Sequence, residues 1–505
     1  MLYSFGKFLP DMPDHMNSGV TVARNVMPRA TKSYGPMPSF AAYATALNAK
    51  CQGAFFVIDK NGVVNGFTGT ASRLYRNTVL SPTPENVSAG GGSPYTTSAA
   101  DRWSFAQFGD KVIATNYTDA PQVWQLAVDS AFAALGGSPP KARYIAVIKD
   151  FVALANINDV TDGKKPARIH WSAIDNPAYW PTVGSSSAAA VLSDIQDLAG
   201  EGGDITGIVG GIANADGVIF QERALWRMLF VGGGSTSDPI FTFDQVEGES
   251  GTSAMSSVIR VGSVVYYYGE NGFRRFDGAT ATPIGHGQVD MYVSSNLELV
   301  HLNRIVAAHD AVNTMVWWAM PFSGNTDGMP NYLIGYNYLC DCWCEVVVDN
   351  EWLASGLSFG DTLDSLDNIN ISLDALPYSL DSRAHSGSRQ NLVGFNSLHQ
   401  LGFFDGANME ATLETGELAA DNGQRFMIQG LRPIVDGGTI TALTRYRNTP
   451  QAALSDTTAT SAALDGICPQ RISARYVRAR VSVAAGGAWT HAKGVEPVME
   501  MDGER

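Results

Sequence analysis

Short apolar segments alternate with turns through the first 350 residues of the chain. Each repeated unit has an apolar run, a turn containing Gly, Asp or Asn, and a second apolar run, often followed by an aromatic residue. Apolar runs of this length, bounded by turn residues, are typical of β-hairpins. Six such units occupy residues 53–77, 103–126, 144–157, 211–233, 256–278 and 304–321.

Corresponding hairpins are spaced about 40 to 50 residues apart, which is the period of a propeller blade. We therefore predict an all-β fold, a β-propeller of six or seven blades with an additional C-terminal β-rich platform. A length of 505 residues would otherwise suggest about three domains. Propellers present surfaces and channels, so the repeat favours binding or assembly over any particular chemistry.

Composition divides the chain into four predicted regions. Residues 1–49 are rich in proline, which disfavours helix, and are expected to form an extended N-terminal docking arm. Residues 50–355 would hold the blades, with one short helix expected within 188–200. Residues 356–395 would form an acidic linker. Residues 396–505 return to strand-like patterns and would complete a last blade or form a separate platform.

The acidic linker contains a short repeat. Ser-Leu-Asp recurs at 365–367, 372–374 and 379–381, and residues 361–382 contain no basic side chain. A Ca²⁺ site would need several carboxylates converging on one ion. We favour an acidic loop held down at intervals by its leucines, because no glycine stands where a tight Ca²⁺-binding turn would require one.

Charge is distributed unevenly along the chain. The formal net charge of −15 argues against general nucleic-acid binding, although it is compatible with DNA sliding through an acidic pore. Between 425 and 480, however, there are eight arginines and three aspartates. Arg478 and Arg480 are two residues apart and should share one strand face. This face would be either solvated or an inter-subunit Arg row that meets the acidic surface of a neighbouring subunit.

The cysteines, the N-terminus and the length of the apolar runs indicate the cellular compartment. The five cysteines are too few and too unevenly spaced for a disulfide framework. Residues 1–8 lack the basic-then-apolar pattern of a signal peptide. No run of about 18 apolar residues is present. We expect synthesis in a reducing cytosol and no export by the usual route.

Two segments were considered as sites of chemistry. Cys340, Cys342 and Cys344 would lie on one side of a strand, but zinc usually takes four ligands with different spacings, so we expect three small apolar residues and no metal. Residues 171–180 have the Asp of a sialidase-type box at the wrong spacing, and we expect a turn capped by Asp175 or Asn176 and closed by aromatic packing.

Nothing in the sequence selects an active site. No nucleophile elbow, phosphate-binding loop, zinc-protease helix or dinucleotide fingerprint is present. A carboxylate pair for glycoside hydrolysis would be invisible in sequence and stays open. We therefore predict no enzyme activity, no catalytic residue, no cofactor and no metal.

Four short motifs occur in order between Phe8 and Phe40. They are Pro10-Asp11, Asn17-Ser18-Gly19, Asn25-Val26-Met27-Pro28 and Tyr34-Gly35-Pro36. This segment resembles the opening of tail hub or nozzle proteins of short-tailed bacteriophages, also called packaged-DNA stabilisation proteins. Residues 168–181, 394–417 and 432–437 are similar to other stretches of those proteins, so the resemblance covers about half of the chain in patches.

The resemblance implies a structural protein of the virion tail, synthesised in the host bacterial cytoplasm. Such proteins form a ring, commonly a hexamer, below the portal–adaptor, where they continue the DNA channel and retain the genome until ejection. The expected partners are copies of the chain itself, the portal–adaptor protein, tail fibre, spike or needle proteins, and double-stranded DNA passing without sequence-specific contact. The arm residues expected to contact the adaptor are Leu9, Val20, Val26, Met27, Met37 and Phe40.

The sequence leaves alternatives to these expectations open. The arm could instead supply a strand to the last blade. The whole protein could be a receptor- or carbohydrate-binding propeller whose exposed loop aromatics, Tyr95, Trp124 and Tyr179, stack on sugars. A propeller hydrolase is the third possibility, and it would need a cluster of acids and an arginine triad in the central funnel.

Overall fold

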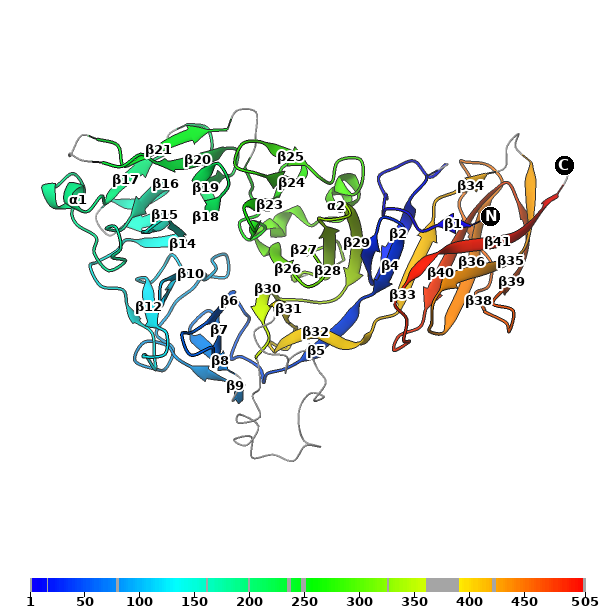
Figure 1. The fold of residues 1–505 in the computed structure, drawn as a ribbon, viewed down its shortest axis with the longest axis horizontal. Helices are drawn as coiled ribbons and strands as arrows, with labels where there is room; N and C mark the ends of the chain where they lie inside the picture. The colour runs from blue at the N-terminus through cyan, green and yellow to red at the C-terminus, as the bar shows by residue number, and fades with distance from the viewer. Residues whose placement is uncertain are drawn as a thin grey trace.

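The computed structural model contains a propeller and a β-sandwich joined side by side (Figure 1). It describes all residues except 1, 16, 79–80, 160–161, 199, 234–237, 247–250, 325–326, 360–389, 420–423 and 503–505. No helix among the described residues is long and apolar enough to cross a membrane. The predicted all-β propeller class is confirmed by these sheets.

The first four blades follow one another along the chain, each a four-stranded antiparallel sheet whose first strand is innermost. Their strands are β6 (Gly53–Ile58), β7 (Val64–Gly69), β8 (Leu74–Thr78) and β9 (Ser81–Asn86); β10 (Ser104–Phe108), β11 (Lys111–Thr115), β12 (Gln122–Gln125) and β13 (Ala133–Ala134); β14 (Lys141–Ile148), β15 (Phe151–Asp159), β16 (Gly163–Trp171) and β17 (Asp194–Asp197); and β18 (Ile205–Ile212), β19 (Ala215–Gln221), β20 (Leu225–Phe230) and β21 (Phe241–Gln245).

Three further blades complete the ring, so the described part of the chain forms seven. Blade 5 ends before two short helices that lead into blade 6. The elements are β22 (Ile259–Val261), β23 (Val264–Gly269), β24 (Gly272–Phe276) and β25 (Ala281–Pro283); α2 (Asp290–Asn296) and η1 (Leu299–Arg304); β26 (Val306–Asp310), β27 (Met315–Met320), β28 (Tyr332–Asn337) and β29 (Cys342–Val347); and β30 (Trp352–Leu357), β31 (Gln390–Phe395), β32 (Leu401–Asn408) and β5 (Pro38–Ala42).

Local sequence explains how each hairpin turns. Between β6 and β7 the carboxylate of Asp59 accepts hydrogen bonds from the backbone N–H groups of Asn61 (2.8 Å) and Val63 (2.9 Å). Gly62 follows with φ +83°, a left-handed conformation that glycine adopts without strain. The acidic and glycine turn residues seen in the sequence therefore have a direct role in ending one strand and starting the next.

Blade 7 closes the ring with strands from both ends of the chain. Its outermost strand, β5, pairs antiparallel with β32, so that Phe40 lies opposite Phe404 and Ala42 opposite Gly402. The alternative in which the N-terminal segment supplies a strand to the last blade is confirmed. The expectation of a free extended arm over residues 1–49 is wrong, because this segment is built into both domains.

The sandwich combines the rest of the N-terminal segment with the C-terminal strands. Two sheets pack face to face through a shared apolar core. The β41 sheet has the order β3 (Val26–Ala30), β4 (Ser33–Pro36), β41 (Ala492–Asp502), β35 (Arg425–Val435) and β39 (Cys468–Ala474), with β1 (Tyr3–Ser4) on β41; the β40 sheet contains β2 (Val20–Arg24), β33 (Ala411–Thr415), β40 (Tyr476–Val483), β36 (Ile440–Arg447) and β37 (Ser455–Asp456), with β34 (Leu418–Ala419) and β38 (Thr460–Ser461).

The two domains share a continuous sheet. Strand β2 lies beside β29 of blade 6 in parallel pairing at Arg24 and Glu345, so the blade continues into the β40 sheet. Asn25 fixes this joint: its N–H donates to the Glu345 carbonyl (2.8 Å), and its side-chain oxygen accepts from the Val347 N–H (2.9 Å). Asn25 has φ +56°, a conformation that Asn tolerates better than most side chains do.

Three further expectations need correction. The helix expected within 188–200 is shorter and earlier, since α1 covers Ser186–Ala190 and β17 occupies part of the predicted span. The linker expected over 356–395 contains the end of strand β30 at its start and strand β31 at its end, and the Ser-Leu-Asp segment lies outside the described residues. Within 396–505, β32 belongs to blade 7 and the remaining strands belong to the sandwich.

Candidate functional site

Four of the six residues expected to contact an adaptor are buried within this chain. Val20, Val26, Met27 and Met37 are buried in the core of this chain, and Leu9 and Phe40 are half-buried. Phe40 packs edge-on against Phe404 of blade 7, with ring centroids 5.7 Å apart. The apolar pattern of the segment therefore reflects its burial between strands, and the predicted docking contacts of these side chains are corrected.

The arginine row lies on one strand face as predicted, but its partners are internal. In β40, Val477, Ala479 and Val481 point into the sandwich, which leaves Arg478 and Arg480 on the other face. Both arginines bind Glu414, with Arg480 Nη2 2.6 Å and Arg478 Nη1 3.6 Å from its carboxylate oxygens. Both arginines of the row therefore have acidic partners within the chain, and Arg478 is buried, while the inter-subunit role stays a prediction.

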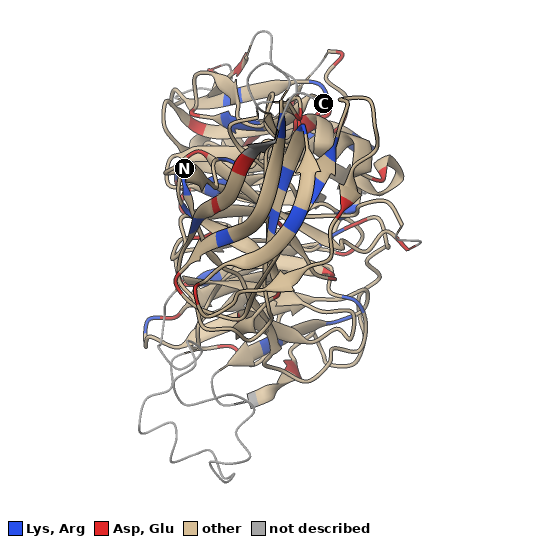
Figure 2. Ribbon diagram, turned by 90° about the vertical axis from the view of Figure 1, so that its right-hand side faces the viewer, with Lys and Arg blue, Asp and Glu red and all other residues tan. Residues whose placement is uncertain are grey.

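Two more arginines extend this network along β36. Arg447 donates to Glu417 (2.6 Å) and Arg445 to Asp456 (2.7 Å). The hydrogen bond to Glu417 raises the pKa of Arg447. On the opposite sheet, Arg432 lies 3.7 Å from Glu496, and Figure 2 shows basic and acidic residues interspersed over this end of the molecule. The C-terminal excess of arginine does not produce a purely basic face here.

The cysteine cluster is divided between a turn and a strand. Cys340 lies in the turn before β29, and Cys342 and Cys344 are buried within that strand. A side-chain hydrogen bond from Cys342 lowers the pKa of Cys340, whereas burial raises the pKa of Cys344. Within the described ranges, no group of three or more His, Cys, Asp or Glu side chains is arranged to hold a metal ion.

The segment 171–180 forms a turn in blade 3. Asn176 accepts a hydrogen bond from the Ala178 N–H (3.1 Å), and the Trp180 indole donates to the Pro177 carbonyl (2.9 Å). His170 packs edge-on against Trp180 with ring centroids 5.0 Å apart, and burial lowers its pKa to about 4. The capped, aromatic-closed turn predicted from the sequence is confirmed, with Asn176 as the capping residue.

One cavity of about 380 Å³ lies in the propeller channel. Its walls are residues at or near the starts of all seven inner strands, so it marks one mouth of the channel. Phe55 and Phe105 stack across it with ring centroids 6.0 Å apart. Arg102 and Arg143 also line it, whereas its lining contains no Asp or Glu, so the acid cluster that a propeller hydrolase would need is not found at this mouth.

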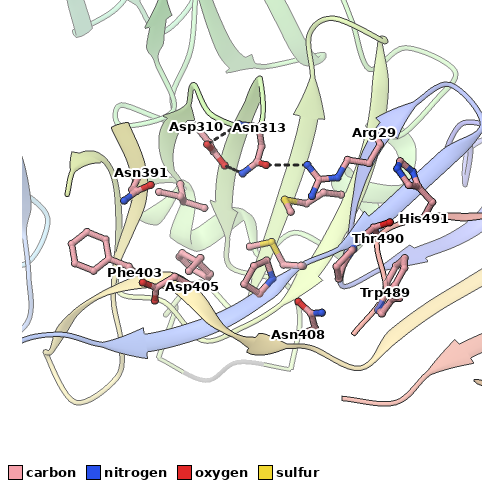
Figure 3. A pocket seen from close by; sticks show the side chains of 16 residues that line it. Arg29, Asp310, Asn313, Asn391, Phe403, Asp405, Asn408, Trp489, Thr490 and His491 are labelled. Atoms are coloured by element: carbon pink, nitrogen blue, oxygen red, sulfur yellow. Dashed lines mark hydrogen bonds between the residues drawn. The ribbon is translucent and has the colours of Figure 1, made fainter. Parts of the chain in front are cut away.

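A second cavity, of about 500 Å³, lies where propeller and sandwich meet (Figure 3). On its propeller side Asp310 accepts a hydrogen bond from the Asn313 amide (2.7 Å), and Asn313 accepts one from Arg29 of β3 (3.2 Å). On its sandwich side the ring of His491 is 2.9 Å from the Ser33 hydroxyl. These bonds run within and between the two domains, so part of the cavity wall also joins the propeller to the sandwich.

Sequence reasoning missed both cavities for the same reason. The channel mouth combines residues from strands spread between 54 and 355, and the junction combines β3, blade 6, blade 7 and residues before β41. Such groupings depend on tertiary structure. The sequence offers one sign of the channel mouth, because Lys50, Arg102 and Arg304 each stand shortly before an apolar run.

Comparison with known proteins finds only solved structures of low sequence identity and low TM-score. No protein-family model matches this chain, and no curated protein does either. A chain in the crystal structure of the mitotic checkpoint complex is 10% identical with a TM-score of 0.39 over 73% of this chain and 94% of that one. The extracellular domain of the one-component system BT4673 from B. thetaiotaomicron is 11% identical, with a TM-score of 0.42 over 83% of this chain and 47% of that one. YCF48 bound to D1 peptide is 10% identical, with a TM-score of 0.35 over 62% of this chain and 87% of that one.

Proposed function

We propose that this chain is a structural subunit of a short phage tail. In this proposal it forms a hub or nozzle ring below the portal–adaptor, continues the DNA channel and retains the packaged genome until ejection. The observation that carries the proposal is the path of residues 1–42, because the four motifs behind the resemblance all lie there and all make structural joints.

Each motif makes specific hydrogen bonds, and those of Asp11 and Asn25 reach the propeller. Asp11 accepts hydrogen bonds from the backbone of Met291 (2.8 Å) and Tyr292 (2.7 Å) at the start of α2. Asn17 binds the Gly19 N–H (2.8 Å). Asn25 joins blade 6 to the sandwich, and the Tyr34 hydroxyl donates to the Gly6 carbonyl (2.8 Å). Hydrogen bonds of this kind hold the segment in place, which fits a structural component of the virion.

Exposed apolar side chains support association with another protein surface. Met291 on α2 is 71% exposed, and Leu299 and Val300 on η1 are 68% and 88% exposed. Large apolar side chains on adjoining exposed elements are typical of surfaces that bind partners. In the proposal this surface contacts a neighbouring subunit or the adaptor.

The carbohydrate-binding alternative has weaker support. Of the three aromatics considered for sugar stacking, Tyr95 and Trp124 are buried, and Tyr179 is 40% exposed. Tyr95 instead donates to Gln122 (3.1 Å), and Trp124 packs against Phe67. Two of the three rings are therefore used for packing within and between blades.

Binding to purified portal–adaptor complex tests the proposal. We expect the intact chain to sediment with the complex, and a variant carrying Met291→Asp and Val300→Asp to bind more weakly while keeping its fold. Lys60→Glu, at an exposed turn on blade 1, serves as the control. Failure of the intact chain to bind, together with cleavage of a glycan by the purified protein, would overturn the proposal in favour of an enzyme.

A further inference from the structure

Three basic side chains lie shortly before inner strands of the propeller. Lys50 precedes β6, Arg102 precedes β10 and Arg304 ends η1 just before β26. The channel cavity is lined by residues at or near the starts of these same strands, and Arg102 is one of its lining residues. The loops that carry the three cations therefore lie next to one another at the channel mouth, with Arg102 in the cavity lining and Lys50 and Arg304 just outside it.

Hydrogen bonds between the three loops hold this arrangement. The Gln52 side chain donates to the Asp101 carbonyl (3.1 Å), and the Trp103 N–H donates to the Gln52 carbonyl (2.9 Å). Arg102 Nη2 donates to the carbonyl of Asn303, the neighbour of Arg304 (3.2 Å). The loops that carry the cations are thus fixed against one another without any charge-neutralising contact.

The three cations lack carboxylate partners. Arg102 is only 7% exposed, and its guanidinium donates to backbone carbonyls of Ala99 (2.9 Å), Asp101 (2.8 Å) and Asn303. Among the residues that the structure describes, none forms an ion pair with Lys50, Arg102 or Arg304. A buried charge without a counter-ion is energetically unfavourable, so this group of side chains is suited to an added anion.

The nearest carboxylates are already engaged. Asp101 lies 2.9 Å from Arg143, and Glu351 lies 2.7 Å from the ring of His399. Glu351 also accepts a hydrogen bond from the Cys51 N–H (3.4 Å). Asp327 is a further acidic group near Lys50, and it accepts a hydrogen bond from the Met329 N–H (3.2 Å). These groups moderate the positive potential at the mouth without pairing with the three cations.

Burial and mutual repulsion act together on this group. Burial first and the charge of Arg304 second lower the pKa of Arg102 to about 10. Burial likewise lowers the pKa of Lys50, with Arg304 and Arg102 acting in the same direction and Glu351 and Asp327 in the opposite one. A bound anion would relieve both the burial penalty and the repulsion.

We propose that Lys50, Arg102 and Arg304 form a binding site for an oxyanion, a phosphate or carboxylate group, at the mouth of the propeller channel. Guanidinium groups bind such oxyanions through paired hydrogen bonds, and an ammonium group adds a point charge. The stacked rings of Phe55 and Phe105 provide apolar surface in the same cavity for the rest of a ligand. This site is independent of the proposed tail function.

Calorimetric titration of the full chain tests the site with two probes. Inorganic phosphate reports the free ion, and a short peptide with one internal aspartate reports a carboxylate, each measured against chloride at equal ionic strength. We expect saturable binding of at least one probe, and at least about tenfold weaker binding by the double variant Lys50→Gln, Arg304→Gln. Lys60→Gln, an exposed lysine on blade 1, is the control and should bind as the parent does.

A melting experiment separates binding from folding. Without an added oxyanion, the double variant should melt at or above the parent temperature, because two repelling charges have been removed. With the anion, the parent should gain stability and the variant should not. The proposal is overturned if neither probe binds, if the variant binds as tightly as the parent, or if the ligand-free variant is less stable than the parent.

Discussion

Arg478 Nη2 lies 2.5 Å from Asp14 Oδ2, so that β40 is tied to the segment leading into β2. The same guanidinium lies 3.6 Å from Glu414 and 3.8 Å from Glu417. Both glutamate side chains are almost completely buried. Arg478 is therefore a positive charge shared by Asp14 and by two buried carboxylates that also pair with Arg480 and Arg447.

Removing this guanidinium should destabilise the sandwich strongly. Arg478→Ala leaves Glu414 with Arg480 and Glu417 with Arg447, so the loss should approach but not exceed the about 3–5 kcal/mol typical of a buried charge left unpaired. Urea denaturation should show this loss in the free energy of unfolding. Arg432→Ala, which removes an exposed pair with Glu496, is the control and should cost less than about 1 kcal/mol. Equal losses in the two variants would contradict the network.

Deletion of residues 1–42 should prevent folding of the propeller as well as of the sandwich. The deletion removes the outermost strand of blade 7 and strands from both sandwich sheets, so apolar edges in both domains lose their cover. Circular dichroism and size-exclusion chromatography of the truncated chain should show aggregation or lost β structure. Adding a synthetic peptide of residues 1–42 should restore part of the signal, whereas a folded, monodisperse truncated protein would refute the account.

Seven blades could be anticipated from the sequence only in part. The six hairpin units are local, and each contains its own turn residues, as with Asp59 and Gly62. Blade 7 could not be identified in this way, because Phe40 pairs with Phe404 across the length of the propeller. Local periodicity carries no information about which distant strand occupies a sheet edge. For the same reason the sequence alone predicts an extended arm for the N-terminal segment.

Charge could be counted from the sequence but not assigned to partners. Strand alternation correctly placed Arg478 and Arg480 on one face. Their partner Glu414 lies on β33, 66 residues before Arg480. Glu417 directly precedes β34. The number of arginines in a segment therefore does not show which of them pair with acidic side chains of the same chain, as Arg478 and Arg480 do with Glu414.

Acid should weaken blade 3 through His170. Its pKa in the folded chain is about 4 because of burial, against about 6.5 in an unfolded chain. Protons therefore bind the unfolded state more readily between these values, so stability is complete above pH 6.5 and falls as the pH drops toward 4. The difference in the pKa of His170 between the two states lowers the free energy of unfolding by up to about 3 kcal/mol near pH 4. His170→Gln should make the free energy of unfolding depend less on pH over this window. An unchanged pH dependence would contradict the role of His170.

Thiol modification should be selective for Cys340. This cysteine is half-buried and its pKa is lowered, whereas Cys342 and Cys344 are buried with raised pKa values. Because the thiolate is the reactive form, iodoacetamide should label Cys340 first in the native protein, as read by peptide mass spectrometry. Cys340→Ser should remove this early label. Equal labelling of all three cysteines would show that the β29 strand is open in solution.

Electron microscopy of the purified chain, viewed end-on, tests the central claim most directly. The account predicts closed rings of several subunits around an open channel, each subunit showing a propeller beside a sandwich. Particles of a single subunit at every concentration, without ring formation on addition of the portal–adaptor complex, would contradict the assignment of this chain to the tail.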